Sequence, residues 1–132
     1  MNNRFRYLIH SVTVLALGGI IYLLLRDRTH IHDILHMPAM LYRLHFVGDS
    51  FVRYTLPDFL WAYSFASALH ALFCGRSRKF VFAAVVLSGA VYEFAQMLSL
   101  IGGTGDVLDI IMYVLAAVIA DYIFFKKKEN KK

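Results

Sequence analysis

Four long apolar runs restrict this chain to helical membrane folds more than any other feature does. Each approaches the length of about 20 residues that a helix, rising about 1.5 Å per residue, needs to cross a hydrocarbon core of about 30 Å. The apolar share of 59% agrees, since soluble domains average about 45 to 50%. We therefore predict an all-α, polytopic membrane protein, with one domain of residues 1–132 and four transmembrane helices. The predicted spans are, to within a few residues, 7–25, 56–74, 80–101 and 107–125.

The first run has an alternative interpretation as a signal peptide, because Arg4 and Arg6 precede it. It is longer than the apolar region of about 7 to 15 residues in such peptides, and no small-residue cleavage pattern follows it. A first membrane span is therefore the preferred prediction.

The basic residues predict the orientation. Lysine and arginine stay preferentially on the cytoplasmic side of a membrane. With four spans both termini lie on the same side, and that side would hold ten of the 14 basic residues. Both termini are therefore predicted to be cytoplasmic. The lysine-rich tail would anchor the last helix at anionic lipid heads, and no nucleic-acid partner is predicted.

The connections between the runs differ in length. The second, "GRSRK", and the third, "GGTGD", are short enough to make their flanking helices antiparallel neighbours. The first, residues 26–55, contains "IHDILHMPAMLYRLHF", whose apolar residues are spaced as one helix face and broken at Pro38. We predict a short interfacial helix in this first outer loop. His32 and His36 have a spacing that can hold zinc, but interfacial histidines are the simpler interpretation, and no metal site is predicted.

Acidic and amide side chains interrupt the outer parts of the apolar runs. Glu93 lies thirteen residues from Phe80, or about 20 Å up the third span. A charge in the hydrocarbon costs at least about 2.5 to 3.5 kcal/mol, so such groups normally face the helix bundle or water. The predicted ligand-binding residues, which all fall in the outer part of the bundle, are Asp58, Glu93, Gln96, Asp106, Asp109 and Tyr113.

Two interpretations of this set remain open. In the first, the residues line an acidic pocket, in which either some carboxyls carry protons or a cation lies among them, because like charges ionise together at a cost. In the second, they are structural. Asp106 and Asp58 would then cap or charge the starts of their helices, and Glu93 and Gln96 would hydrogen-bond between helices.

A second polar pair lies near the cytoplasmic ends of the spans. His70 and Asp121 could form a proton relay with Glu93, since intramembrane acids and histidines mark such paths. The preferred interpretation is that Asp121 pairs with Lys126 or Arg76.

The sequence from Glu93 to Asp109 resembles the VanZ-like family of small bacterial membrane proteins. The family element is a Glu-x-x-Gln pair, a glycine-containing turn and an Asp-x-x-Asp pair, and here it reads "EFAQ", "GGTG" and "DVLD". The resemblance implies a bacterial inner-membrane location and, from the founding member, a role in antibiotic tolerance. Many members carry an arginine in the turn, where this chain has Thr104, so the pocket is expected to lack an internal counter-charge.

These observations favour a binding protein for an envelope lipid, a glycan precursor or a cationic compound, with membrane lipids as its surroundings. A membrane enzyme acting on lipid-linked substrates and a small proton-coupled carrier are the alternatives, and no catalytic residue or cofactor is predicted. Pairs of small residues four apart, such as Ala116 and Ala120, allow close helix packing within the chain or between copies in a homo-oligomer.

Overall fold

The computed structural model describes residues 3–26, 33–36, 38, 50–73, 77–102 and 105–129, without the side chains of residues 3 and 125–129. All regular structure in this part of the chain is helical, which confirms the all-α prediction. The elements in chain order are α1 (Asn3–Leu25), the π-helical turn η1 (Phe51–Thr55), α4 (Leu56–Phe73), α5 (Arg78–Met97) and α6 (Val107–Glu129).

The helix bounds follow the predicted spans, with differences at three ends. α1 begins four residues earlier than predicted, and α6 continues through the lysines to Glu129. α5 ends at Met97 rather than near residue 101, although the next residues are apolar. It ends there because Leu98 closes the last turn and Ser99 takes a left-handed conformation, with φ of 55°.

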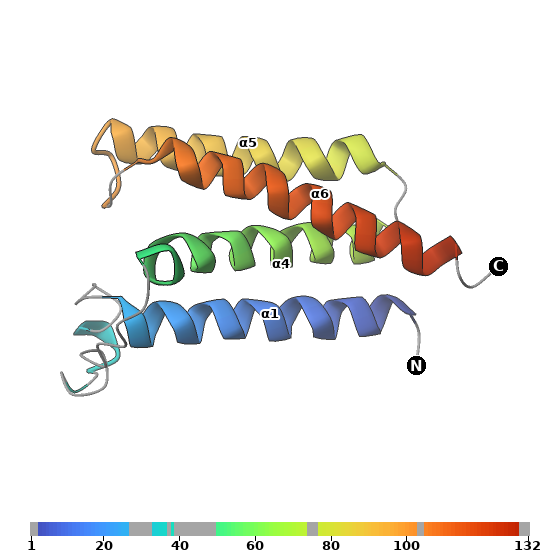
Figure 1. The fold of residues 1–132 in the computed structure, drawn as a ribbon, viewed down its shortest axis with the longest axis horizontal. Helices are drawn as coiled ribbons and strands as arrows, with labels where there is room; N and C mark the ends of the chain where they lie inside the picture. Colours follow the sequence, from blue (N-terminus) through green and yellow to red (C-terminus); the bar gives the residue numbers. More distant parts are fainter. Residues whose placement is uncertain are drawn as a thin grey trace.

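The four long helices run up and down beside one another (Figure 1). α4 lies between α1 and α6, and α5 packs mainly against α6. α1 begins and α6 ends at the same end of the bundle, which we call the basic end after Arg4, Arg6 and Arg78. The opposite end, which contains Asp58, Glu93 and Asp109, is called the acidic end.

Small side chains form most of the interior. Ala66 and Ala116 are fully buried, and Ala117 and Ala120 are nearly so. Helices in lipid gain little from the hydrophobic effect when they associate, so close van der Waals packing matters more. Small residues allow this packing because they let the helix backbones approach closely. The predicted packing role of Ala116 and Ala120 is therefore confirmed within the chain.

Polar contacts fasten α1 to α4. The Ser11 hydroxyl donates to the Ser64 carbonyl oxygen at 2.8 Å, and the Ser64 hydroxyl donates to the Ser11 carbonyl oxygen at 2.8 Å. Next to this pair, His10 Nε2 lies 3.0 Å from the Tyr63 hydroxyl. Such hydrogen bonds are the usual means of joining helices in a membrane.

Three of the described helices are long and apolar enough to cross a membrane: Arg4–Leu25, Arg78–Met97 and Val107–Phe124. Large apolar side chains cover their outer faces, and Val12, Leu87 and Val91 are each more than 60% exposed. Contiguous apolar surface of this kind marks contact with lipid or with another protein. The chain is thus a membrane protein by the length and hydropathy of these helices.

Most of the predicted interfacial helix lies outside the described residues, as do His30 and His32. Of that segment the structure describes Asp33–His36 and Pro38. Residues 33–36 form one exposed turn, in which the His36 amide donates to the Asp33 carbonyl oxygen at 3.3 Å.

The contact of α1 with α4 predicts different effects for two adjacent glycines. A Cβ added at Gly18 would lie 3.1 Å from Trp61 Cδ1 and 3.2 Å from Leu60 Cβ, whereas at Gly19 nothing lies within 4 Å. We expect Gly18→Leu to lower the free energy of unfolding by about 1 to 3 kcal/mol through overpacking. Thermal unfolding in a neutral detergent measures the change.

Gly19→Leu is the matched control, because it makes the same gain in helix propensity without the contact. Equal melting temperatures for the two variants would contradict the α1–α4 packing described here.

Candidate functional site at the acidic end

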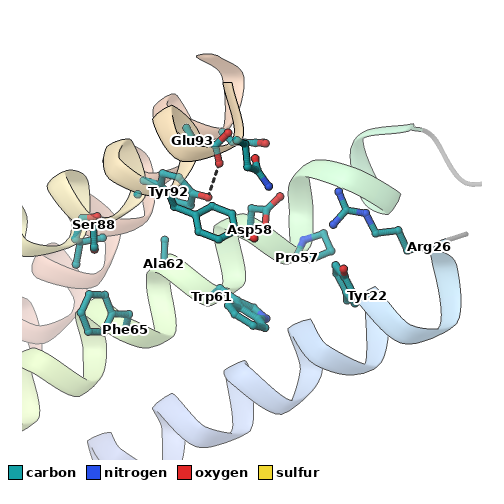
Figure 2. Close-up of a pocket in the computed structure, with 15 residues that line it drawn as sticks. Tyr22, Arg26, Pro57, Asp58, Trp61, Ala62, Phe65, Ser88, Tyr92 and Glu93 are labelled. Atoms are coloured by element: carbon teal, nitrogen blue, oxygen red, sulfur yellow. Dashed lines mark hydrogen bonds between the residues drawn. The ribbon is translucent and has the colours of Figure 1, made fainter. Parts of the chain in front are cut away.

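A cavity of about 440 Å³ opens among the four long helices at the acidic end (Figure 2). Its size lies within the usual range of about 300 to 1,000 Å³ for small-molecule sites. Five of the six predicted site residues line it, and Asp106 does not. The complete lining is Tyr22, Arg26, Pro57, Asp58, Trp61, Ala62, Phe65, Val85, Ser88, Gly89, Tyr92, Glu93, Gln96, Asp109 and Tyr113.

Glu93 is the most buried acid of the site, with 1% of its surface exposed. The Tyr113 hydroxyl donates to Glu93 Oε1 at 3.0 Å (Figure 2), and the Asp106 backbone N–H donates to Oε2 at 2.9 Å. Both carboxyl oxygens are therefore occupied by donors from the start of α6 and its preceding turn. The interpretation of Glu93 as an interhelical hydrogen-bonding residue is confirmed.

Two glycines make room for these bonds. Gly89 faces the ring of Tyr113 so closely that any Cβ there would overlap the ring. A Cβ at Gly105 would lie 2.5 Å from Met97 Cγ and 2.6 Å from the Glu93 carbonyl oxygen. The turn after α5 therefore rests directly on the backbone of α5, which brings the Asp106 amide within reach of the Glu93 carboxyl.

Asp106 and Gln96 also have structural partners. Asp106 Oδ1 accepts from the Leu108 backbone N–H at 2.9 Å, so this residue caps α6 as the capping interpretation predicts. Gln96 Nε2 donates to the Gly102 carbonyl oxygen at 3.2 Å and so holds the turn, while its side chain also borders the cavity.

Asp58 and Asp109 differ from the other acids. Both line the cavity and are partly exposed, and neither carboxyl accepts a hydrogen bond from the described part of the chain. They come from different helices, α4 and α6, and face the same space. These two carboxyls are the groups of the site that remain open to a ligand.

Arg26 corrects the expectation that the pocket lacks a counter-charge. It follows α1 directly and lines the cavity, and Figure 2 shows its side chain extending toward Pro57 and Asp58. Its guanidinium carbon lies 4.9 Å from the ring centre of Tyr22 and 5.5 Å from that of Tyr54. Stacking on two aromatic rings fixes the direction of the guanidinium.

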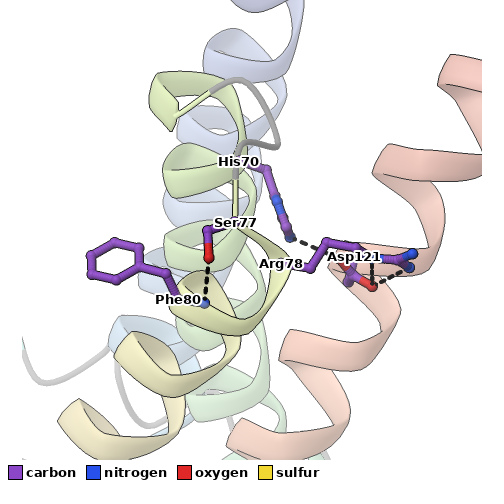
Figure 3. A network of polar contacts seen from close by, with 5 residues as sticks. All are labelled: His70, Ser77, Arg78, Phe80 and Asp121. Atoms are coloured by element: carbon purple, nitrogen blue, oxygen red, sulfur yellow. Dashed lines mark hydrogen bonds and ion pairs between the residues drawn. The ribbon is translucent and has the colours of Figure 1, made fainter.

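A separate polar cluster lies at the basic end (Figure 3). Arg78 donates to both oxygens of Asp121, the shortest contact being 2.6 Å, and His70 Nε2 lies 3.6 Å from Asp121 Oδ1. The partner of Asp121 that the structure describes is thus Arg78, whereas the side chains of the predicted partners Arg76 and Lys126 lie outside the described residues. His70 is twelve residues, or about 18 Å, from Asp58 along α4, so this cluster is not part of the cavity.

No protein-family model, curated protein or solved structure matches this chain. The interpretation of the site therefore depends on its own geometry.

Ten of the lining residues were not predicted as site residues, and three of them illustrate why: Arg26, Trp61 and Tyr92. Arg26 directly follows the first apolar run, a position typical of a basic residue that flanks a span, and this position also places it at the depth of Asp58. Trp61 lies near the start of the second apolar run, where a tryptophan equally fits the aromatic belt at a membrane interface. Tyr92 precedes Glu93 and had no assigned role, since nothing in the spacing shows which side of α5 a tyrosine faces.

Because Glu93 is hydrogen-bonded through both oxygens, we predict that replacing it destabilises the protein more than replacing Asp109. In Glu93→Gln one carboxyl oxygen is replaced by an NH₂ group, which cannot accept a hydrogen bond. Either the Asp106 backbone N–H or the Tyr113 hydroxyl then loses its acceptor. We expect the free energy of unfolding to fall by about 1 to 3 kcal/mol, the cost of a buried donor without a partner. Thermal unfolding in neutral detergent measures this.

Asp109→Asn is the matched carboxyl-to-amide control in the same cavity. We expect it to unfold at the wild-type temperature or slightly above, because it removes a negative charge that has no hydrogen bond. Equal losses in the two variants would show that Glu93 is not the structural acid.

Proposed function

We propose that α4 is the fourth transmembrane span of a bacterial inner-membrane protein with both termini in the cytoplasm. α4 has 18 residues, and its apolar sequence is interrupted by polar residues such as Asp58 and His70. Asp58 faces the cavity and His70 is fully buried, so neither needs to meet lipid. The position of α4 between two apolar helices supports its crossing with them.

This topology can be tested with the full-length chain. Ser50 and Ser77, both exposed, lie just before η1 and just before α5, so a crossing by α4 places them on opposite sides of the membrane. In a Cys74→Ser background we expect Ser50→Cys to react with a membrane-impermeant maleimide in spheroplasts. Ser77→Cys should react only after permeabilisation. Labelling of both residues from the same side would exclude a fourth span.

For the cavity, we propose that it binds a ligand through a positively charged or hydroxyl-rich group. The observation that carries this is the pair of carboxyls, Asp58 and Asp109, that face one space from two helices and accept no hydrogen bond from any described residue. A buried or half-buried charge normally finds a partner, and a ligand cation supplies one for both acids. The resemblance to VanZ-like proteins adds a role in the envelope or in antibiotic tolerance to this proposal.

The other residues of the site then have supporting roles. Glu93, Tyr113 and Asp106 hold the start of α6 in place, which sets the direction of Asp109. Gln96 fixes the turn above the cavity. In this division Asp58 and Asp109 are the contacts for the ligand, whereas the sequence-based hypothesis included Glu93, Gln96, Asp106 and Tyr113 among the ligand-binding residues as well.

Calorimetric titration with spermidine, a water-soluble amine, tests the binding site. We expect saturable binding to the purified protein in neutral detergent, and at least an about tenfold loss of affinity in Asp58→Asn and in Asp109→Asn. A loss of that size corresponds to about 1.4 kcal/mol, near the value of one charge-assisted hydrogen bond.

Asp33→Asn serves as the control, since it removes the same charge from an exposed residue that does not line the cavity. Equal weakening by all three substitutions would mean that net charge, and not the cavity, attracts the amine.

A further inference from the structure

The cavity has a charged end and an apolar end. Arg26, Asp58 and Asp109 lie at the outer end of its helices, whereas Phe65 and Val85 line its deeper part. From Asp58 to Phe65 the lining descends seven residues of α4, or about 10 Å. A water-soluble ligand would leave this deeper part unused.

The apolar end opens sideways between α1 and α5. α1 packs against α4, whereas α5 packs mainly against α6 and makes little contact with α4. Trp61 is 53% exposed and Phe65 43% exposed although both line the cavity. Because these helices have apolar outer faces, the opening meets the acyl layer of the membrane.

The charged end carries both signs without an internal ion pair. Arg26 lines the same cavity as Asp58 and Asp109, yet no ion pair joins it to either acid within the described residues. Its guanidinium is held over the rings of Tyr22 and Tyr54. A planar guanidinium suits a phosphate, and a carboxyl pair suits an ammonium group.

We propose that the occupant of the cavity is a zwitterionic phospholipid that carries a primary amine. Its ammonium group contacts Asp58 and Asp109, its phosphate contacts Arg26, and one acyl chain lies along Trp61 and Phe65. The lipid enters from the plane of the membrane through the opening between α1 and α5. This inference rests on the proposed binding function and adds the class of ligand and its route.

The single tryptophan of the chain, Trp61, provides the measurement, because it lines the apolar end. A lysophosphatidylethanolamine with a brominated acyl chain is titrated into the full-length protein in neutral detergent. We expect saturable quenching of Trp61, with an apparent affinity at least about tenfold higher than for brominated lysophosphatidylglycerol, which lacks the amine.

Variants separate the parts of the site. Arg26→Gln should weaken lipid binding about tenfold, whereas spermidine binding should persist and become tighter, because the substitution removes a positive charge beside the two acids. Ser88→Ile should block the apolar end, since Ser88 lines the cavity from α5. Ala83→Ile, at an exposed residue of α5 outside the lining, is its control. Melting temperatures show that each variant is folded.

Two results would overturn the lipid proposal while leaving amine binding intact. One is equal, non-saturating quenching by both brominated lipids, which is what contact of an exposed tryptophan with detergent alone produces. The other is spermidine binding that depends on Asp58 together with lipid binding that is insensitive to Arg26→Gln and Ser88→Ile. Absence of both spermidine and lipid binding would remove the proposed function as well.

Discussion

The buried carboxyl of Glu93 determines the geometry of the acidic end. It joins the last turns of α5 to the second turn of α6 through the Tyr113 hydroxyl, and to the residue just before α6 through the Asp106 backbone N–H. A carboxyl so deeply buried is costly unless its oxygens are hydrogen-bonded, and here each oxygen accepts one bond. The second donor lies at the N-terminus of α6, where the helix dipole also favours negative charge. The bundle can therefore hold this acid without a cationic partner.

This arrangement separates the acids into two groups with different tasks. Glu93 and Asp106 satisfy backbone donors at the start of α6, and the close approach of Gly105 to α5 makes this possible. Asp109 lies three residues after Asp106, so the cap that begins the helix also fixes the face on which Asp109 projects. Glu93 and Asp106 thus take the structural positions, which leaves Asp58 and Asp109 facing the cavity without a hydrogen bond from the described part of the chain.

The sequence predicts the helices well and the roles within the cavity poorly. Apolar length locates all four long helices, Pro57 marks the start of α4, and Asp106 is recognisable as a cap from its place before Val107. The end of α5 was missed because apolar residues continue past Met97, while a left-handed Ser99 stops the helix. Hydrophobic patterns carry no information on such a backbone conformation.

Arg26 shows why the sequence does not predict all the residues that line the cavity. Its contribution depends on the lateral position of α1, which the Ser11 and Ser64 hydroxyls fix against α4 rather than against α5. No spacing within one helix specifies that choice of neighbour. Because α1 packs against α4, Arg26 at the end of α1 lines the same cavity as Asp58 and Asp109. The same packing leaves α1 apart from α5. The same packing choice thus gives the cavity its positive group and its opening toward the membrane.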